Sequence, residues 1–128
     1  MEEIEFRRKF ADATNAIQDR VKARVGEDPV VVYSAYNTDA DGIPIDNLDD
    51  VPIQGKVCFL LKCSDMFPGE GGKDYESEVL ENPTWLDICA CANEALKSVG
   101  DTHYVFLEVL RKIGKSDDVT VAHMEFGS

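Results

Sequence analysis

The chain has 128 residues, a length that fits one domain able to bury roughly two-thirds of its unfolded surface. Its formal net charge of −12 disfavours nucleic acids and acidic lipid surfaces as partners, because an anionic surface repels phosphate groups. The first residues lack the apolar run of a secretory signal, and no stretch of about 18 apolar residues is present to span a membrane. We therefore expect a soluble cytoplasmic protein with a single domain over residues 1–128.

The first predicted element is a helix from Glu3 to Val25. Its apolar residues recur at steps of three and four, which places them on one stripe of a helix. These residues are Phe6, Phe10, Ala13, Ile17 and Val21. Gly26 favours the left-handed conformation that ends a helix, and Pro29 prevents its continuation.

Two strands are predicted before the second helix. Val30 to Tyr36 is a nearly continuous apolar run, which is typical of a central strand or one covered on both sides. Lys56 to Cys63 has one clearly apolar face with a period of two residues, as expected of a strand. A polar loop, Asn37 to Gln54, separates them.

The second predicted helix has clear start and stop signals. Asn82 is predicted to cap it, since its side-chain carbonyl can accept from an early helical N–H, and Pro83 suits the first helical position. The apolar residues of Trp85 to Val99 cover a wide arc of the helix, which predicts burial. Gly100 then provides a left-handed stop.

The chain closes with a predicted hairpin. His103 to Ile113 and Val119 to Phe126 are rich in aromatic and β-branched residues, and Gly114 to Asp118 provides the turn between them. The resulting order is α-β-β-α-β-β. This order predicts an α+β fold with a four-stranded, mainly antiparallel sheet and two helices packed on one face.

The polar loop contains a candidate calcium site. Asn37, Asp39 and Asp41 supply oxygen ligands at alternate positions, and Gly42 follows where a sharp turn is needed. The segment resembles the first half of an EF-hand loop, which implies that these three residues would bind calcium. The resemblance ends at Leu48, where the family has a bidentate glutamate. The alternative is an ordinary turn at Asp41 and Gly42 in a solvated loop.

The register of the hairpin defines a second candidate site. If Lys112 pairs with Val119, then Glu108 faces His123 across the two strands. One face of the sheet then carries Tyr104, Phe106, Glu108, Leu110, Val121 and His123. The other face, which is expected to meet the helices, carries Val105, Leu107, Val109, Ala122, Met124 and Phe126.

The first of these faces is too apolar to be simply solvated, and it has two interpretations. A buried pair of Glu108 and His123 beside aromatic rings could act as general acid and base, because histidine titrates near neutral pH. The same pair is also an ordinary stabilising contact between neighbouring strands. A second apolar sheet face is more often an interface than a pocket, and we favour a partner surface that includes Tyr104, Phe106 and Leu110.

These patterns leave two functional hypotheses. The first is a non-catalytic protein-interaction or dimerisation module, which forms a homodimer or binds a protein partner through the open sheet face. The long loop from Ser64 to Glu81 would add exposed apolar anchors for the partner. These anchors are Met66, Phe67 and Tyr75. The alternative is a small-molecule binding protein or a small enzyme, with a pocket around Glu108 and His123.

Overall fold

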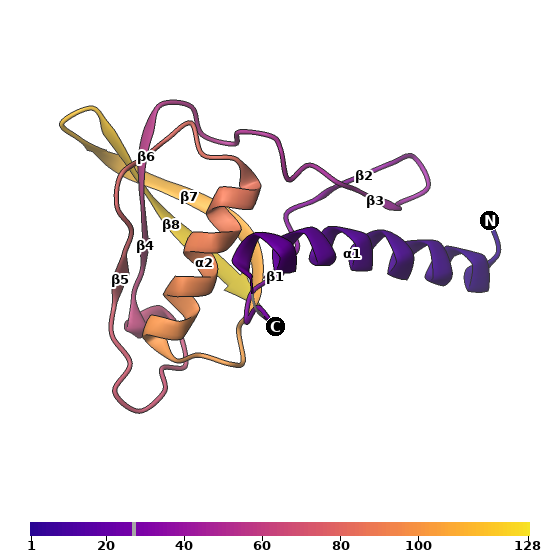
Figure 1. The fold of residues 1–128 in the computed structure, drawn as a ribbon, viewed down its shortest axis with the longest axis horizontal. Helices are drawn as coiled ribbons and strands as arrows, with labels where there is room; N and C mark the ends of the chain where they lie inside the picture. Colours follow the sequence, from indigo (N-terminus) through magenta and orange to yellow (C-terminus); the bar gives the residue numbers. More distant parts are fainter. Residues whose placement is uncertain (27) are drawn as a thin grey trace.

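The computed structural model describes residues 1–26 and 28–128, which form helices and strands in a single α+β arrangement (Figure 1). The helices are α1 (Glu3–Val25) and α2 (Trp85–Val99), and a short 3-10 turn, η1, covers Cys63–Asp65. The strands are β1 (Val32–Tyr33), β2 (Asn37–Thr38), β3 (Pro44–Ile45), β4 (Lys56–Leu61), β5 (Tyr75–Glu76), β6 (Leu80–Glu81), β7 (Phe106–Ser116) and β8 (Val119–Gly127). The predicted α+β class is confirmed.

The main sheet is mixed, so the prediction of a four-stranded, mainly antiparallel sheet was wrong. The strand order is β1-β7-β8-β4-β5, and β6 pairs with β4 beside β5. β1 runs parallel to β7 and β4 runs parallel to β8, whereas β7 and β8 form the predicted antiparallel hairpin. β2 and β3 form a separate two-stranded sheet. The extra strands are two residues long, too short to carry a periodic signal in the sequence.

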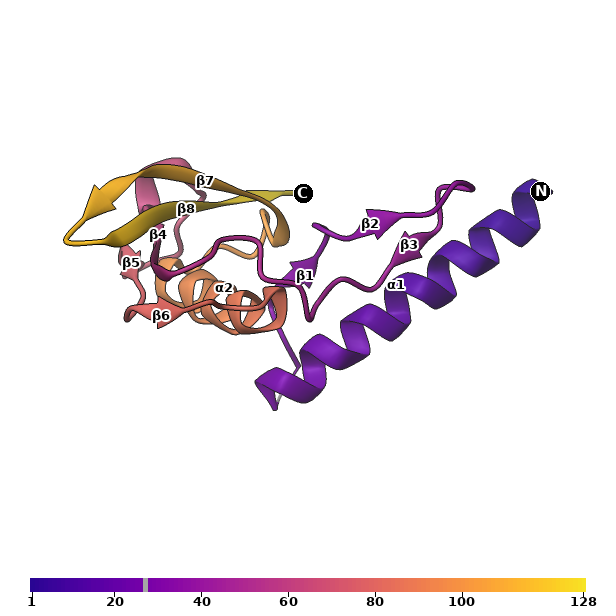
Figure 2. The same cartoon turned by 90° about the horizontal axis from the view of Figure 1, so that it is seen from above.

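The two helices have different positions relative to the sheet. α2 lies across one face of it, as Figure 2 shows from above. α1 runs alongside, and only its C-terminal half reaches the core, where Ile17 and Val21 are buried. Its N-terminal half and the β2–β3 hairpin project together as an arm, in which Phe6 packs against Phe10 and Phe10 packs edge-on against Tyr36. The prediction of both helices on one sheet face was therefore right for α2 only.

β1 forms hydrogen bonds on both of its edges, with a strand on one edge and with helix side chains on the other. Val32 and Tyr33 pair with the start of β7. On the other side, the Gln18 side chain donates to the carbonyl of Val31 (2.9 Å) and accepts from the N–H of Tyr33 (3.2 Å). The Asn93 side-chain oxygen accepts from the N–H groups of Val30 (2.7 Å) and Val31 (3.2 Å). Helix side chains thus replace a neighbouring strand, which explains why the predicted strand of 30–36 is so short.

The cap of α2 is two residues later than the sequence suggested. Thr84 is the N-cap, and it exchanges hydrogen bonds with Asp87 in a capping box. Asn82 instead has a left-handed backbone (φ 48°), and its side-chain oxygen accepts from the N–H of Gly55 (2.7 Å). It therefore fastens the start of β4 rather than the helix. The stop at Gly100 is confirmed, with φ 80°.

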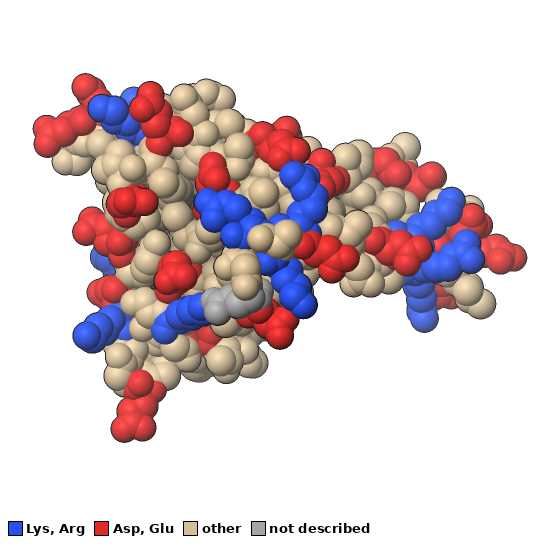
Figure 3. Space-filling model, viewed as in Figure 1, with Lys and Arg blue, Asp and Glu red and all other residues tan. Residues whose placement is uncertain are grey.

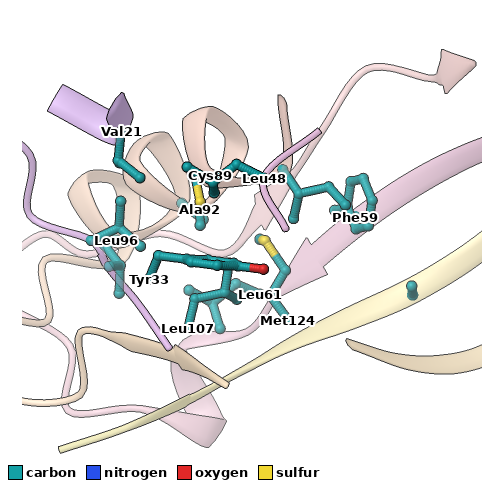
Figure 4. Close-up of a cluster of buried hydrophobic side chains, with 14 of the residues drawn as sticks. Val21, Tyr33, Leu48, Phe59, Leu61, Cys89, Ala92, Leu96, Leu107 and Met124 are labelled. Atoms are coloured by element: carbon teal, nitrogen blue, oxygen red, sulfur yellow. The ribbon is translucent and has the colours of Figure 1, made fainter. Parts of the chain in front are cut away.

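The core lies between α2, the inner face of the sheet and the C-terminal half of α1. Leu61 from β4 and Leu107 from β7 lie below Ala92 and Leu96 of α2 in Figure 4, and Phe59 from β4 belongs to the same buried cluster further along the sheet. Asn93 is fully buried among these apolar residues, and its Nδ2 has no hydrogen-bond partner in the described part of the chain. Its acceptor oxygen is the part of the side chain that the fold uses.

The loop after η1 is docked on the end of α2. The N–H of Gly69 donates to the carbonyl of Val99 (3.0 Å), and that of Lys73 donates to Ser98 (2.8 Å). These bonds satisfy carbonyls that the end of a helix leaves unpaired. Gly72 lies so close to α2 that an added Cβ would overlap the Val99 carbonyl oxygen. The loop is therefore a structural strap at this point rather than a free lid.

Candidate functional site

The register predicted for the hairpin was wrong. Ser116 pairs with Val119, so the turn consists of Asp117 and Asp118 alone, both with positive φ. Further along the hairpin, Arg111 rather than Glu108 faces His123. Two irregularities in β7, between Leu107 and Val109 and between Lys112 and Gly114, shift the register further. Each such bulge adds one residue to one strand, so pairing cannot be counted out from the turn.

The first bulge also exchanges the two faces of β7. Leu107 is buried toward α2 as predicted, together with Ala122 and Met124 of β8. Beyond Glu108 the alternation reverses, so Leu110 pairs with buried Met124 and packs on the core. Val109 is 51% exposed on the open face, where the prediction had buried it. Phe106 is 37% exposed, and its place on a partner surface stays a prediction.

Glu108 and His123 do not form a pair. The carboxylate of Glu108 lies at the bulge and contacts Gly127 at the end of β8. His123 of β8 lies opposite Arg111, which is three positions beyond Glu108 on β7. The acid and base suggested for catalysis are therefore not adjacent, and the nearest carboxylate to the histidine comes from η1.

His123 lines a pocket of about 280 Å³ at the end of β8. β4 ends at Leu61 while β8 continues to Gly127, which leaves room between β8 and the segment that follows β4. The imidazole of His123 is only 7% exposed, and its Nδ1 lies 3.8 Å from the carboxylate of Asp65, beyond hydrogen-bond distance. Arg111 donates from Nε to Glu125 (2.7 Å) at the rim. Four apolar residues complete the lining: Leu61, Met66, Met124 and Phe126.

A second hollow follows the free edge of β7. β1 pairs with Phe106 and Leu107 only, and no other described strand lies on that side, so 108–116 form an unpaired edge. Two adjoining hollows of about 310 and 460 Å³ border it. Both are lined by Pro52, Ile53 and Lys112, and we call them together the edge groove. Trp85 lies at one end of the groove and Lys115 at the other.

The charges on the edge groove differ from those of the molecule as a whole. Figure 3 shows acidic side chains dispersed over the visible surface, with basic ones between them. Lys112 and Lys115 are exposed, and neither forms an ion pair within residues 1–26 and 28–128. Arg111, on the opposite face of the same strand, is already paired with Glu125. The groove thus carries Glu108 at the Trp85 end and the two lysines, Lys112 and Lys115, toward the other end, which is the basic part of an acidic protein.

The predicted apolar anchors have different environments. Phe67 is 59% exposed and stacks on Tyr104, with ring centroids 5.1 Å apart, so the structure brings these two predicted residues together. Met66 and Tyr75 are half-buried and pack against the core. Burial raises the pKa of the Tyr75 phenol, which lies beside Cys91. Met66 and Tyr75 therefore belong mainly to the structure, and Phe67 is the exposed member.

Asp101 organises the Phe67 and Tyr104 cluster from below. Its carboxylate is 1% exposed and accepts from the N–H groups of Phe67 (2.8 Å), His103 (2.6 Å) and Tyr104 (3.0 Å). Burial alone would raise its pKa, but these three donors outweigh burial and hold the pKa of Asp101 below its usual value.

A pH dependence of stability follows from that lowered pKa. Because the folded-state pKa lies below the ordinary value of 3.8, Asp101 stabilises the fold above about pH 4, and this contribution disappears as the pH falls further. We expect urea denaturation of Asp101→Asn to give lower stability than wild type at pH 7. The difference should shrink as the pH falls below 4. A difference that stays constant with pH would contradict the assigned role of the charge.

The candidate calcium loop is folded as a hairpin turn. Asn37 lies in β2, and one carboxylate oxygen of Asp39 accepts from the N–H groups of Asp41 (2.8 Å) and Ile43 (3.0 Å). No group of three His, Cys, Asp or Glu side chains suited to hold an ion occurs in the described residues. The further acids of this region, Asp46 and Asp49, are both paired with Arg20 at 2.7 Å. The geometry therefore matches an acidic turn better than an EF-hand-like site.

The described residues form a small α+β protein with a mixed sheet, an unpaired stretch of β7 and a charged pocket at His123. No protein-family model, curated protein or solved structure matches the chain. Among the described residues, no helix combines the length and apolar character needed to cross a membrane. Function must therefore be argued from the geometry of the edge groove and the His123 pocket.

Several residues of these two sites were missed from the sequence. Asp65, Arg111 and Glu125 were not associated with His123, and Pro52 and Ile53 were assigned only to the polar loop of 37–54. A two-residue turn at Asp117 and Asp118 would have brought the register to within one position of the observed one. The edge groove could not be predicted from the sequence. It exists because β1 ends after pairing with two residues of β7, and the length of β1 has no local sequence signal.

Proposed function

We propose that this protein is a non-catalytic protein-interaction module that adds an extended, acidic segment of a partner protein to the free edge of β7. The observation that carries the proposal is the unpaired edge of 108–116 beside the edge groove. An unpaired edge offers a row of N–H and C=O groups to another strand. Strand addition draws affinity from these groups and specificity from pockets that receive alternate side chains.

The chemistry of the groove supports an acidic partner. Lys112 points toward α2, on the same side as its pairing partner Ala122, and therefore lines the groove beside Ile53. Alternate side chains of an added strand would enter this groove. A carboxylate there would meet Lys112 and Lys115, while a neighbouring apolar side chain would meet Pro52 and Trp85.

A second copy of this chain suits the edge less well. A symmetric antiparallel pair centred on Leu110 would oppose Glu108 and Lys112 favourably. It would also bring Ile113 of the second copy against Leu107, where β1 already occupies the edge. Centring on Arg111 or Lys112 would set like charges face to face, which is destabilising. The homodimer predicted from the sequence is therefore an outcome to be tested, and the partner we propose is a different protein.

Binding of a defined peptide tests the proposal. We expect a fluorescein-labelled extended peptide, with glutamate and valine in turn at the groove-facing positions and threonine between them, to bind the full chain with a micromolar Kd by fluorescence anisotropy. Lys112→Glu should weaken binding at least about tenfold, equivalent to about 1.4 kcal/mol. The matched control Lys56→Glu changes an exposed lysine of β4, on the far side of β8, and should leave binding unchanged.

The backbone contribution can be separated from simple charge attraction. In a second peptide, every other amide is N-methylated, on the edge that would face β7. This peptide keeps its charge but has no N–H donors on that edge, so it should not bind. Equal binding of the methylated peptide, or equal weakening by Lys56→Glu, would refute strand addition. Light scattering that shows a dimer dissociated by Lys112→Glu would replace the acidic partner with a second copy.

A further inference from the structure

We infer that the His123 pocket is a binding site for a free α-amino acid with an apolar side chain. This site is independent of the edge groove and lies on the opposite face of β7. Adjacent residues of the strand face the two sites: Arg111 lines the His123 pocket, and Lys112 lines the groove. The inference rests on the polar groups of the pocket, their partners and the apolar floor.

The polar groups of the pocket are incompletely used. His123 is more than nine-tenths buried, faces the pocket and has no hydrogen-bond partner among the described residues; the nearest carboxylate oxygen, on Asp65, is 3.8 Å away. Arg111 uses only Nε on Glu125, so its two terminal nitrogens have no partner in the described part of the chain. The ring nitrogens of His123 are not among the fully buried polar atoms without a partner, so they are open to the pocket and available to a ligand.

The signs of the charges select the ligand class. A simple anion would be attracted by Arg111 but would also meet Asp65 and Glu125. A simple cation would be attracted by the two carboxylates but would meet the guanidinium. A molecule that carries both charges can satisfy both kinds of group. Its carboxylate would bind the free terminal nitrogens of Arg111, and its ammonium would bind Asp65.

The rest of the lining determines the side chain. Four apolar residues line the pocket and form its floor: Met66 and Phe126, which are half-buried, and Leu61 and Met124, whose side chains are buried toward the core. A pocket of about 280 Å³ holds a small molecule but not a peptide chain. His123, between the floor and Asp65, would hydrogen-bond the ligand from below with whichever ring nitrogen faces it. The fit is therefore to a free amino acid such as leucine or methionine.

Thermal unfolding with defined probes tests this inference. L-leucine at ten times its Kd should raise the Tm of the full chain by about 5 °C. Isoamylamine, which lacks the carboxylate, and isocaproate, which lacks the ammonium, should each give less than a fifth of that shift. Arg111→Gln and Asp65→Asn should abolish the leucine shift, and both residues are exposed enough for the variants to fold.

The neighbouring lysine provides the matched control. Lys112→Gln should show the same rise in Tm with leucine as wild type, although it should bind the acidic peptide more weakly. The two sites can therefore fail independently of each other. Three results would overturn the amino-acid site. They are the absence of any shift with leucine or methionine, equal shifts with the two truncated analogues, and an undiminished leucine shift in Arg111→Gln.

Discussion

Replacing Asn93 with leucine is expected to destabilise the protein by about 2–4 kcal/mol, because it leaves one buried and one half-buried N–H group without an acceptor. These groups belong to Val30 and Val31, immediately before β1, and Val31 is fully buried. Leucine nearly matches asparagine in shape, so the loss reflects the acceptor rather than a cavity. The side-chain Nδ2 has no partner to lose, which limits the cost to the two accepted bonds.

Urea denaturation followed by circular dichroism measures this loss, and hydrogen exchange locates it. The exchange of 30–33 should accelerate more than that of β8, since β1 loses its helix-side support. Glu94→Leu is the control for helix propensity, because Glu94 is the next residue of α2 and is exposed. It should lower the free energy of unfolding by less than about 0.5 kcal/mol. Equal stability of Asn93→Leu and wild type would mean that β1 does not depend on this side chain.

Replacing Gly72 with alanine is expected to cost about 2–4 kcal/mol, the sum of a steric overlap and weakened hydrogen bonds. The new Cβ would overlap the Val99 carbonyl oxygen, which is backbone and cannot rotate away. The loop would have to leave α2, and the bonds from Gly69 to Val99 and from Lys73 to Ser98 would stretch or break. The carbonyls at the helix end would then depend on water.

Gly71→Ala separates this contact from an effect of backbone conformation. Gly71 has φ 76°, but an added Cβ there meets no atom within 4 Å. It should therefore cost only about 1 kcal/mol, the usual penalty for alanine at positive φ. A Gly72→Ala loss no larger than that of Gly71→Ala would show that the strap does not hold the end of α2.

Local signals were sufficient to predict the longer elements. The apolar stripe and Gly26 set the limits of α1, and Gly100 set the end of α2. β4, β7 and β8 were found because each is long enough for its composition and alternation to be visible. The inner face of the sheet was also partly right, as Leu107, Ala122 and Met124 are all buried.

The candidate sites were harder to predict, because they depend on single-residue events. One bulge at Glu108 moves Leu110 to the core face and Val109 to the open face. A turn made of two aspartates lacks the asparagine–glycine signal that usually reveals a two-residue hairpin. The length of β1, and with it the free edge of β7, depends on Gln18 and Asn93, which are distant in sequence.

The projecting arm divides the molecule into two parts with different cooperativity. The body is stabilised by a shared core, so its helix and strands must open together. The N-terminal half of α1 is held chiefly by the Phe6, Phe10 and Tyr36 rings and by the β2–β3 hairpin, and Ile4 is 81% exposed. A helix with so little tertiary support frays in steps from its free end. We therefore expect the arm to open at a lower free energy than the body, which contains both sites.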